Sequence, residues 1–199
     1  MSETTAASER ARRQEKIGVV LASLVALPAL AVAATIGGNY YAPQYDYRDF
    51  FAATDGKNFP VILAGDAFPG VDPGVVARDL LPAMQRAKPR PALTFTYDRP
   101  VPPASPDYRL VLVFDPANNL NADPVCAGQP ARFKPGTPGR FYVYAIYCRN
   151  SQAMSFTTAW TQATGPNDPR IEQLFRELFM VIFTDQQQRF AELNPMLIP

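Results

Sequence analysis

The chain has 199 residues, of which 19 are basic and 18 acidic, with two cysteines and no histidine. Four basic and three acidic residues lie in the first 38, which leaves 15 of each beyond them and no basic surface suited to nucleic acid. Without histidine the chain lacks the commonest general base and the His-containing catalytic and metal sites, and two cysteines are too few to hold zinc or copper. We therefore expect no metal, no cofactor and no catalytic residue that a motif identifies.

The first predicted element is an uncharged apolar stretch over residues 17–38, which follows a basic tail over residues 1–16. Its 22 residues suit a membrane-spanning helix, which needs about 20, better than the shorter core of a signal peptide. Arg and Lys resist translocation, so the tail should stay in the cytoplasm and the remainder of the chain should cross the bilayer. The sequence therefore predicts a single-pass signal-anchor.

Two features of this stretch leave cleavage open as an alternative. Ala31-Val32-Ala33 is a small-residue pattern that a signal peptidase could cut, and Pro28 lies in the middle of the stretch, where a spanning helix needs neighbours to satisfy the freed carbonyl. If the segment is removed, the remainder is a soluble exported protein.

The next segment, residues 39–56, is predicted to be an aromatic linker beside the membrane. Tyrosine is enriched at membrane interfaces, so these rings could form an interfacial belt or fold back onto the domain. Exposed rings could instead bind a partner subunit or stack on sugars. The candidate docking residues are Tyr40, Tyr41, Tyr45, Tyr47, Phe50 and Phe51.

Residues 57–199 have the length and pattern of one α+β domain. Apolar alternation and helix-capping residues predict its elements. In chain order these are a strand over 59–65, a helix from Pro73 that Pro82 should kink or stop, strands over 92–97, 108–114, 140–148 and 153–162, and a long helix capped by Asp168. We expect a mainly antiparallel sheet covered on one face by the two helices.

The two cysteines, Cys126 and Cys148, are predicted to form a disulfide. In an oxidising compartment an even number of cysteines favours pairing, and two unpaired buried thiols are the alternative. By the chain-entropy argument this bridge stabilises the fold by about 3 kcal/mol. It would also hold down residues 115–138, a segment too long for an ordinary connection.

The segments DYRLVLVFDP (107–116) and YAIYCR (144–149), with the chain after Pro166, resemble a family of uncharacterised exported bacterial proteins over residues 57–182. No activity is established for that family, so the resemblance implies no site residue. It implies a protein of the bacterial envelope. With the predicted anchor, this places the domain in the periplasm and the anchor in the inner membrane.

The functional hypothesis is a membrane-tethered interaction module, such as an accessory subunit or assembly factor of an envelope complex. One alternative is a glycan hydrolase that uses two carboxylates, because Asp66 and Asp115 both follow predicted strands. Each aspartate could equally bind the backbone of its own turn. The second alternative is a carrier that holds an apolar ligand between the helices and the sheet.

Overall fold

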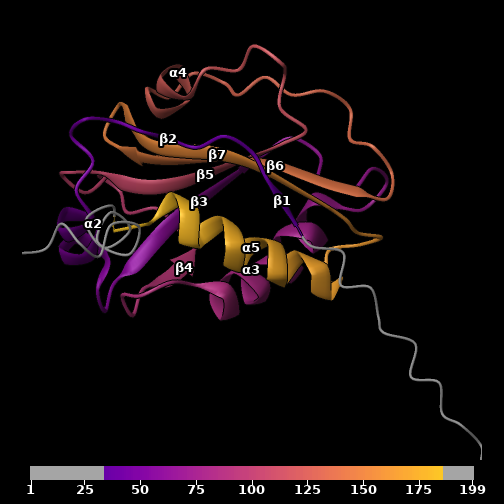
Figure 1. Ribbon diagram of the computed structural model, residues 1–199, viewed down its shortest axis with the longest axis horizontal. Helices are drawn as coiled ribbons and strands as arrows, with labels where there is room; N and C mark the ends of the chain where they lie inside the picture. Colours follow the sequence, from indigo (N-terminus) through magenta and orange to yellow (C-terminus); the bar gives the residue numbers. More distant parts are fainter. Residues whose placement is uncertain (1–33, 186–199) are drawn as a thin grey trace, which may run out of the picture. The chain divides into compact units, whose positions relative to one another are not determined.

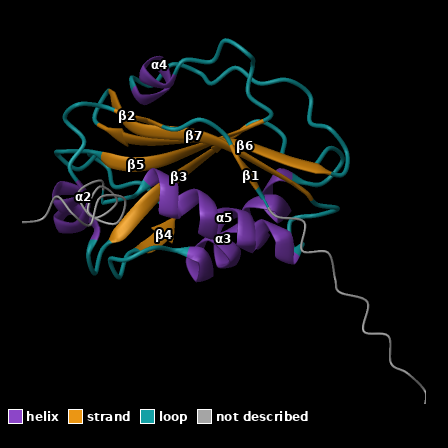
Figure 2. Ribbon diagram, in the orientation of Figure 1, coloured by secondary structure: helices purple, strands orange, loops and turns teal. Residues whose placement is uncertain are grey.

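The computed structural model describes residues 34–185, and its centre is a seven-stranded mixed sheet with the strand order β1-β7-β6-β5-β3-β4, in which β2 also pairs with β7 (Figure 2). Helices α3 and α5 lie on one face, and α4 with a long loop lies on the other (Figure 1). The strands are β1 (Thr35–Ile36), β2 (Tyr40–Tyr41), β3 (Asn58–Ala64), β4 (Thr94–Thr96), β5 (Tyr108–Phe114), β6 (Arg140–Arg149) and β7 (Gln152–Gln162). The helices are α2 (Tyr47–Thr54), α3 (Pro73–Ala87), α4 (Ala122–Cys126) and α5 (Pro169–Ile182).

The expected α+β class is confirmed, but the sheet is mixed. Strand β3 is parallel to both of its neighbours, β4 and β5, whereas β1, β2, β5 and β6 make antiparallel pairs with β6 or β7. The parallel pairing of β3 with β4 follows from helix α3, because a crossover helix returns the chain to the same edge of the sheet. Periodicity predicts the strands, but it does not show which of them are neighbours.

Helix α3 continues through Pro82, so this proline, which was expected to kink or stop the helix, does not stop it. The Asp72 carboxylate caps the helix by accepting a hydrogen bond from Val75 N at 3.1 Å. Pro82 lies on the exposed side, where water can satisfy the carbonyl that loses its partner. Leu80 before it and Met84 after it are fully buried, so packing against the sheet stabilises both halves of the helix.

The space between the helices and the sheet is filled with aromatic rings. Phe141 of β6 contacts Phe175 of α5 with ring centroids 5.9 Å apart, and Phe179 contacts Phe95 of β4 at 5.1 Å. These side chains are buried to 2% exposure or less. An apolar-ligand carrier would need open space in this layer, and the rings that occupy it give that hypothesis no support.

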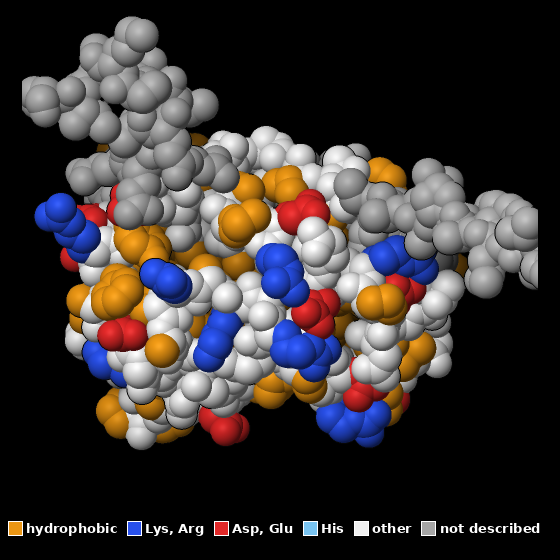
Figure 3. Space-filling model, turned by 60° about the horizontal axis from the view of Figure 1, so that its bottom comes forward, with side chains coloured by type: hydrophobic (Ala, Val, Ile, Leu, Met, Phe, Trp, Pro, Cys, Tyr) orange, Lys and Arg blue, Asp and Glu red, His pale blue; other side chains and the backbone are white. Residues whose placement is uncertain are grey.

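The outer surface of α3 and α5 is charged. Glu172 accepts hydrogen bonds from Arg86 at 2.7 Å and from Arg176 at 2.9 Å, and basic and acidic side chains alternate over this face in Figure 3. Such a surface suits contact with water rather than with an apolar partner.

Residues 34–46 run along the outer edge of β7, and we call this segment the strap. In it β1 pairs Thr35 with Trp160, and β2 pairs Tyr40 with Phe156. Between the two strands Gly37 lies so close to β7 that an added Cβ would be 2.2 Å from Thr158 Oγ1. The strap therefore belongs to the sheet.

The strap changes two of the expected boundaries. The end of the predicted anchor over residues 17–38 is a strand, because Thr35 and Ile36 pair with β7, while residues 17–33 lie outside the described part of the chain. The expected linker over residues 39–56 contains β2 and α2. Among residues 34–185 no helix is long and apolar enough to span a bilayer.

Candidate functional site

Three of the aromatic residues expected to dock a partner use their hydroxyl groups inside the domain. Tyr41 donates to the carbonyl of Val181, and Tyr45 donates to the carbonyl of Thr184 at 2.8 Å. Tyr47 donates to the carbonyl of Arg90 at 3.1 Å. Burial raises the pKa of Tyr45 and of Tyr47 above the ordinary phenol value, so both stay protonated donors. Their roles in these contacts are structural.

The other three candidate docking residues, Tyr40, Phe50 and Phe51, differ in exposure. Phe50 is completely buried and stacks on Phe183 with centroids 4.4 Å apart, which makes it a core residue. Tyr40 is 46% exposed and Phe51 is 41% exposed. Phe51 meets Tyr47 of the same helix edge to face at 6.4 Å, whereas Tyr40 stacks on Phe156 at 4.8 Å and so joins a larger group of rings.

That larger group covers the side of β6 and β7 that faces away from the long helices, and we call it the aromatic face. Cross-strand register places Tyr142 beside Trp160, and Tyr144 beside Thr158. Tyr144 also meets Phe156 edge to face at 5.5 Å. Trp160 is 40% exposed. The members of the aromatic face are Tyr40, Tyr142, Tyr144, Phe156 and Trp160.

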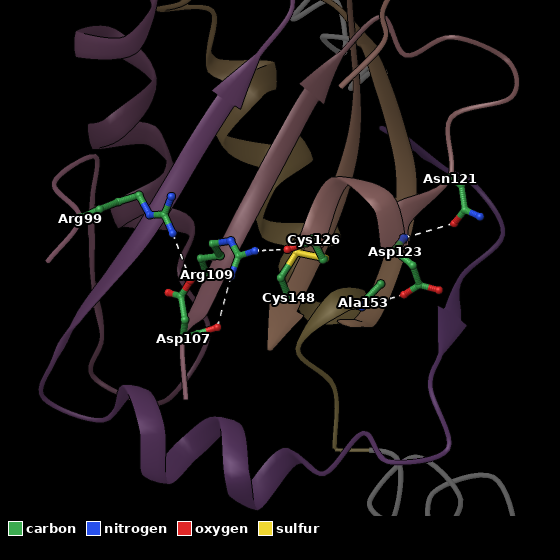
Figure 4. Close-up of a disulfide and its surroundings, with 8 residues drawn as sticks. All are labelled: Arg99, Asp107, Arg109, Asn121, Asp123, Cys126, Cys148 and Ala153. Carbon is green, nitrogen blue, oxygen red and sulfur yellow. Dashed lines mark hydrogen bonds and ion pairs between the residues drawn. A yellow bond between two sulfur atoms is a disulfide. The ribbon is translucent and has the colours of Figure 1, made fainter. Parts of the chain in front are cut away.

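Residues 115–138 cover only the neighbouring part of this side of the sheet, and we call them the cap. The disulfide of Cys126 and Cys148 ties the cap to β6, with Cα atoms 5.5 Å apart, as the sequence predicted. The Asp123 carboxylate accepts a hydrogen bond from Ala153 N at 3.0 Å, which ties α4 to β7 (Figure 4). Both ties lie close to the β6–β7 turn.

A buried arginine, Arg109, contacts the cap beside the disulfide. Arg109 donates to the carboxylate of Asp107 at 2.6 Å and to the carbonyl of Cys126, as Figure 4 shows. Desolvation lowers the pKa of its guanidinium, while the charge of Asp107 opposes that change. Asp107 also pairs with Arg99 at 3.0 Å, so two arginines share this one carboxylate. This network holds the cap at Cys126.

Between the rest of the cap and the sheet is a hollow of about 370 Å³. It is lined on the sheet by Tyr142, Tyr144 and Thr158, and on the cap by Pro116, Ala117, Asn118 and Leu120. The lining residues therefore include two tyrosines, a threonine and an asparagine beside aliphatic side chains. Such a lining can hold a peptide or another flat, partly polar group by stacking and hydrogen bonding.

The two aspartates of the hydrolase hypothesis follow strands, as expected, and these strands, β3 and β5, prove to be parallel neighbours, but the two carboxylates differ in environment. The side chain of Asp115 is 2% exposed and its Oδ1 accepts from Arg140 at 2.8 Å. The exposed Asp66 accepts a hydrogen bond from Phe68 N at 3.1 Å within its own turn. Because Asp115 is enclosed and ion-paired, this pair gives no support to carboxylate catalysis.

Among the described residues, His, Cys, Asp and Glu side chains nowhere gather in a group of three that could hold a metal ion. Comparison with protein-family models, with curated proteins and with solved structures finds no match for this chain. The family resemblance noted from sequence therefore stays a prediction, and function must be argued from the aromatic face itself.

Sequence reasoning placed Trp160 on a strand but did not find the aromatic face. In β6, aromatic residues alternate onto both sides of the sheet, with Phe141 facing the helices and Tyr142 facing away. The alternation of aromatic residues in β6 therefore does not indicate which side of the sheet stays exposed. The signal that could have found it is the pairing of Tyr142 with Trp160, which requires the hairpin register.

Proposed function

We propose that this protein is an interaction module of the bacterial envelope, tethered to the inner membrane by its apolar N-terminal segment. In this proposal the domain lies on the periplasmic side and binds a protein partner through the aromatic face. The role is that of an accessory subunit or assembly factor.

The observation that supports this proposal is an incompletely covered sheet. The cap is fixed near the β6–β7 turn, and beyond it Tyr40 and Trp160 remain about half exposed. Buried protein interfaces are enriched in Tyr, Trp, Phe and Arg, and binding energy concentrates in a few aromatic anchors. Arg140, whose guanidinium lies 5.0 Å from the ring centre of Tyr142, adds an arginine to the same surface.

The charged outer surface of α3 and α5 is less suited to binding a partner than the aromatic face. Its exposed groups are paired with one another, so binding there would require breaking ion pairs without burying much apolar surface. A partner that recognises this domain gains more from the aromatic face.

Site-specific photocrosslinking in native membranes tests the proposal. A photoreactive phenylalanine analogue replaces Tyr142 at the floor of the hollow, and in a matched control it replaces Gln173 on the exposed side of α5. We expect a discrete crosslinked protein product from position 142 and none from position 173. Equal crosslinking at both positions, or recovery of the protein alone from solubilised membranes, would contradict the proposal.

A further inference from the structure

We propose that the hollow between the cap and the aromatic face binds an acidic segment of the protein partner, with the carboxylates of that segment at the Tyr142 end of the hollow. This inference rests on the proposed function and adds the chemistry and the direction of the bound segment. It follows from where the charges around the hollow lie and from which of them lack a counter-charge.

Two basic residues of the cap, Arg132 and Lys134, lie beside the Tyr142 end of the hollow. Phe133 between them forms a β-bridge with Pro116, which lines the hollow. The amide of the residue before Pro116 donates to the carbonyl of Tyr142 at 3.0 Å. Along β6, both cations are therefore closer to the level of Tyr142 than to the β6–β7 turn.

The side chains of Arg132 and Lys134 are held by neutral oxygen atoms. Lys134 Nζ donates to Oδ1 of Asn118 at 2.8 Å, and Arg132 Nη2 donates to the carbonyl of Asn119 at 3.3 Å. Both basic residues are exposed, and within residues 34–185 no carboxylate pairs with either of them. Two positive charges are thus positioned beside the lining of the hollow without a counter-charge.

The other charges of this region are matched or lie further away. Arg140 pairs with Asp115 at 2.8 Å, so its charge is compensated. Asp66 follows β3, on the side of β5 away from the hollow, and Asp123 is tied to β7 near the β6–β7 turn. The hollow is therefore flanked by positive charge at its Tyr142 end and by negative charge toward the turn. Such a charge arrangement attracts carboxylates to the Tyr142 end and sets the direction of the bound segment.

The lining of the hollow suits an extended piece of protein. Tyr142 and Tyr144 lie two positions apart on one face of β6, which corresponds to about 7 Å along a strand, and alternate side chains of an extended peptide have the same spacing. At about 370 Å³ the hollow has room for only a few side chains. Two uncompensated cations are too few for nucleic acid, whose binding typically uses about 6 to 10 phosphate contacts.

The full chain with the photoreactive probe at position 142, in native membranes, provides the test. A second substitution, Lys134→Gln, removes the charge but keeps a side-chain amide that can donate to Asn118, and Lys134→Arg keeps the charge. Lys57→Gln is the matched control, because Lys57 is also exposed and also donates to a neutral oxygen, the carbonyl of Ala52 at 2.9 Å. Mass spectrometry of the crosslinked product identifies the segment of the partner that was bound.

We expect Lys134→Gln to lower the yield of crosslinked protein at least about 5-fold, because the partner loses a charge-assisted contact. Lys134→Arg and Lys57→Gln should stay within about 2-fold of the unsubstituted chain. The crosslinked segment should contain aspartate or glutamate close to the point of attachment. Equal urea midpoints of the Lys134 and Lys57 variants verify that the fold is intact.

The outcomes separate this inference from the proposed function. An unchanged yield with Lys134→Gln, an equal loss with Lys57→Gln, or a crosslinked segment without acidic residues would refute the acidic partner and leave the proposed function standing. A crosslinked lipid or glycan in place of a protein, or no product at all, would refute the proposed function and this inference with it.

Discussion

The two faces of the sheet are closed by different means. On the helical face, aromatic rings from α5 and the strands pack with aliphatic side chains of α3 and have almost no exposure, and among the described residues this face has no covalent tie. On the cap face, a disulfide, a buried arginine and one short helix hold a loop over a smaller apolar cluster. A face closed by packing excludes everything else, whereas a face closed at a few points leaves surface for a partner.

The largest loss of stability is expected from a substitution that leaves a cavity between the long helices and the sheet. Phe179→Ala removes a fully buried ring that contacts Phe95 and Phe175, and it should lower the free energy of unfolding by about 3 to 5 kcal/mol. Urea denaturation measures the change. The neighbouring exposed Met180→Ala is the control and should change stability by less than about 0.5 kcal/mol. Similar losses for both variants would mean that the helical face is not the main source of stability.

Removing the disulfide should have the next largest effect and should act on the cap. The double substitution Cys126→Ala and Cys148→Ala should cost about 3 kcal/mol by the chain-entropy argument. Limited proteolysis should then cut within the cap before any other part of the domain. A reducing agent should reproduce both effects in the wild-type chain and leave the double variant unchanged. If the cap of the double variant resists protease as well as the wild type, packing alone holds it.

The start of α5 offers a smaller change that depends on pH. A hydrogen bond from Arg170 lowers the pKa of Asp168 from 3.8 to about 2. A depressed carboxyl pKa stabilises the folded state above the unfolded value, and this stabilisation is lost as the pH falls from about 4 to about 2. Asp168→Ala should therefore cost about 1 kcal/mol at pH 7, where it also removes the helix cap. Its difference from wild type in thermal unfolding should vanish near pH 2, and a difference that persists there would point to another cause.

The smallest effect on stability is expected from the aromatic face. Trp160→Thr keeps a strand-forming residue at an exposed position and should change the unfolding free energy by no more than about 0.5 kcal/mol. A loss comparable to that of Phe179→Ala in the same urea assay would show that this ring closes the face rather than leaving it open.

Much of the fold follows from local sequence patterns, and the exceptions have a common cause. A nearly continuous apolar run correctly predicts β5, two β-rich runs around a tight turn predict the β6–β7 hairpin, and the Asp168 cap with its helical repeat predicts α5. The strap was missed because strands of two residues exist only through pairing with β7, 125 positions further along the chain for Thr35. Phe50 likewise stacks on Phe183, far along the chain. Local patterns cannot show such contacts, and the same limit concealed the aromatic face.

The strap also determines when the domain can be completed. Its partners are β7 and the end of α5, where Tyr41 and Tyr45 bind carbonyl groups of Val181 and Thr184. These are among the last described parts to be synthesised, so the first residues beyond the apolar segment must remain unpaired until nearly the whole chain has left the ribosome. Pairing of the strap with β7 is therefore a late step of folding, although the strap is the first described part of the chain to be made.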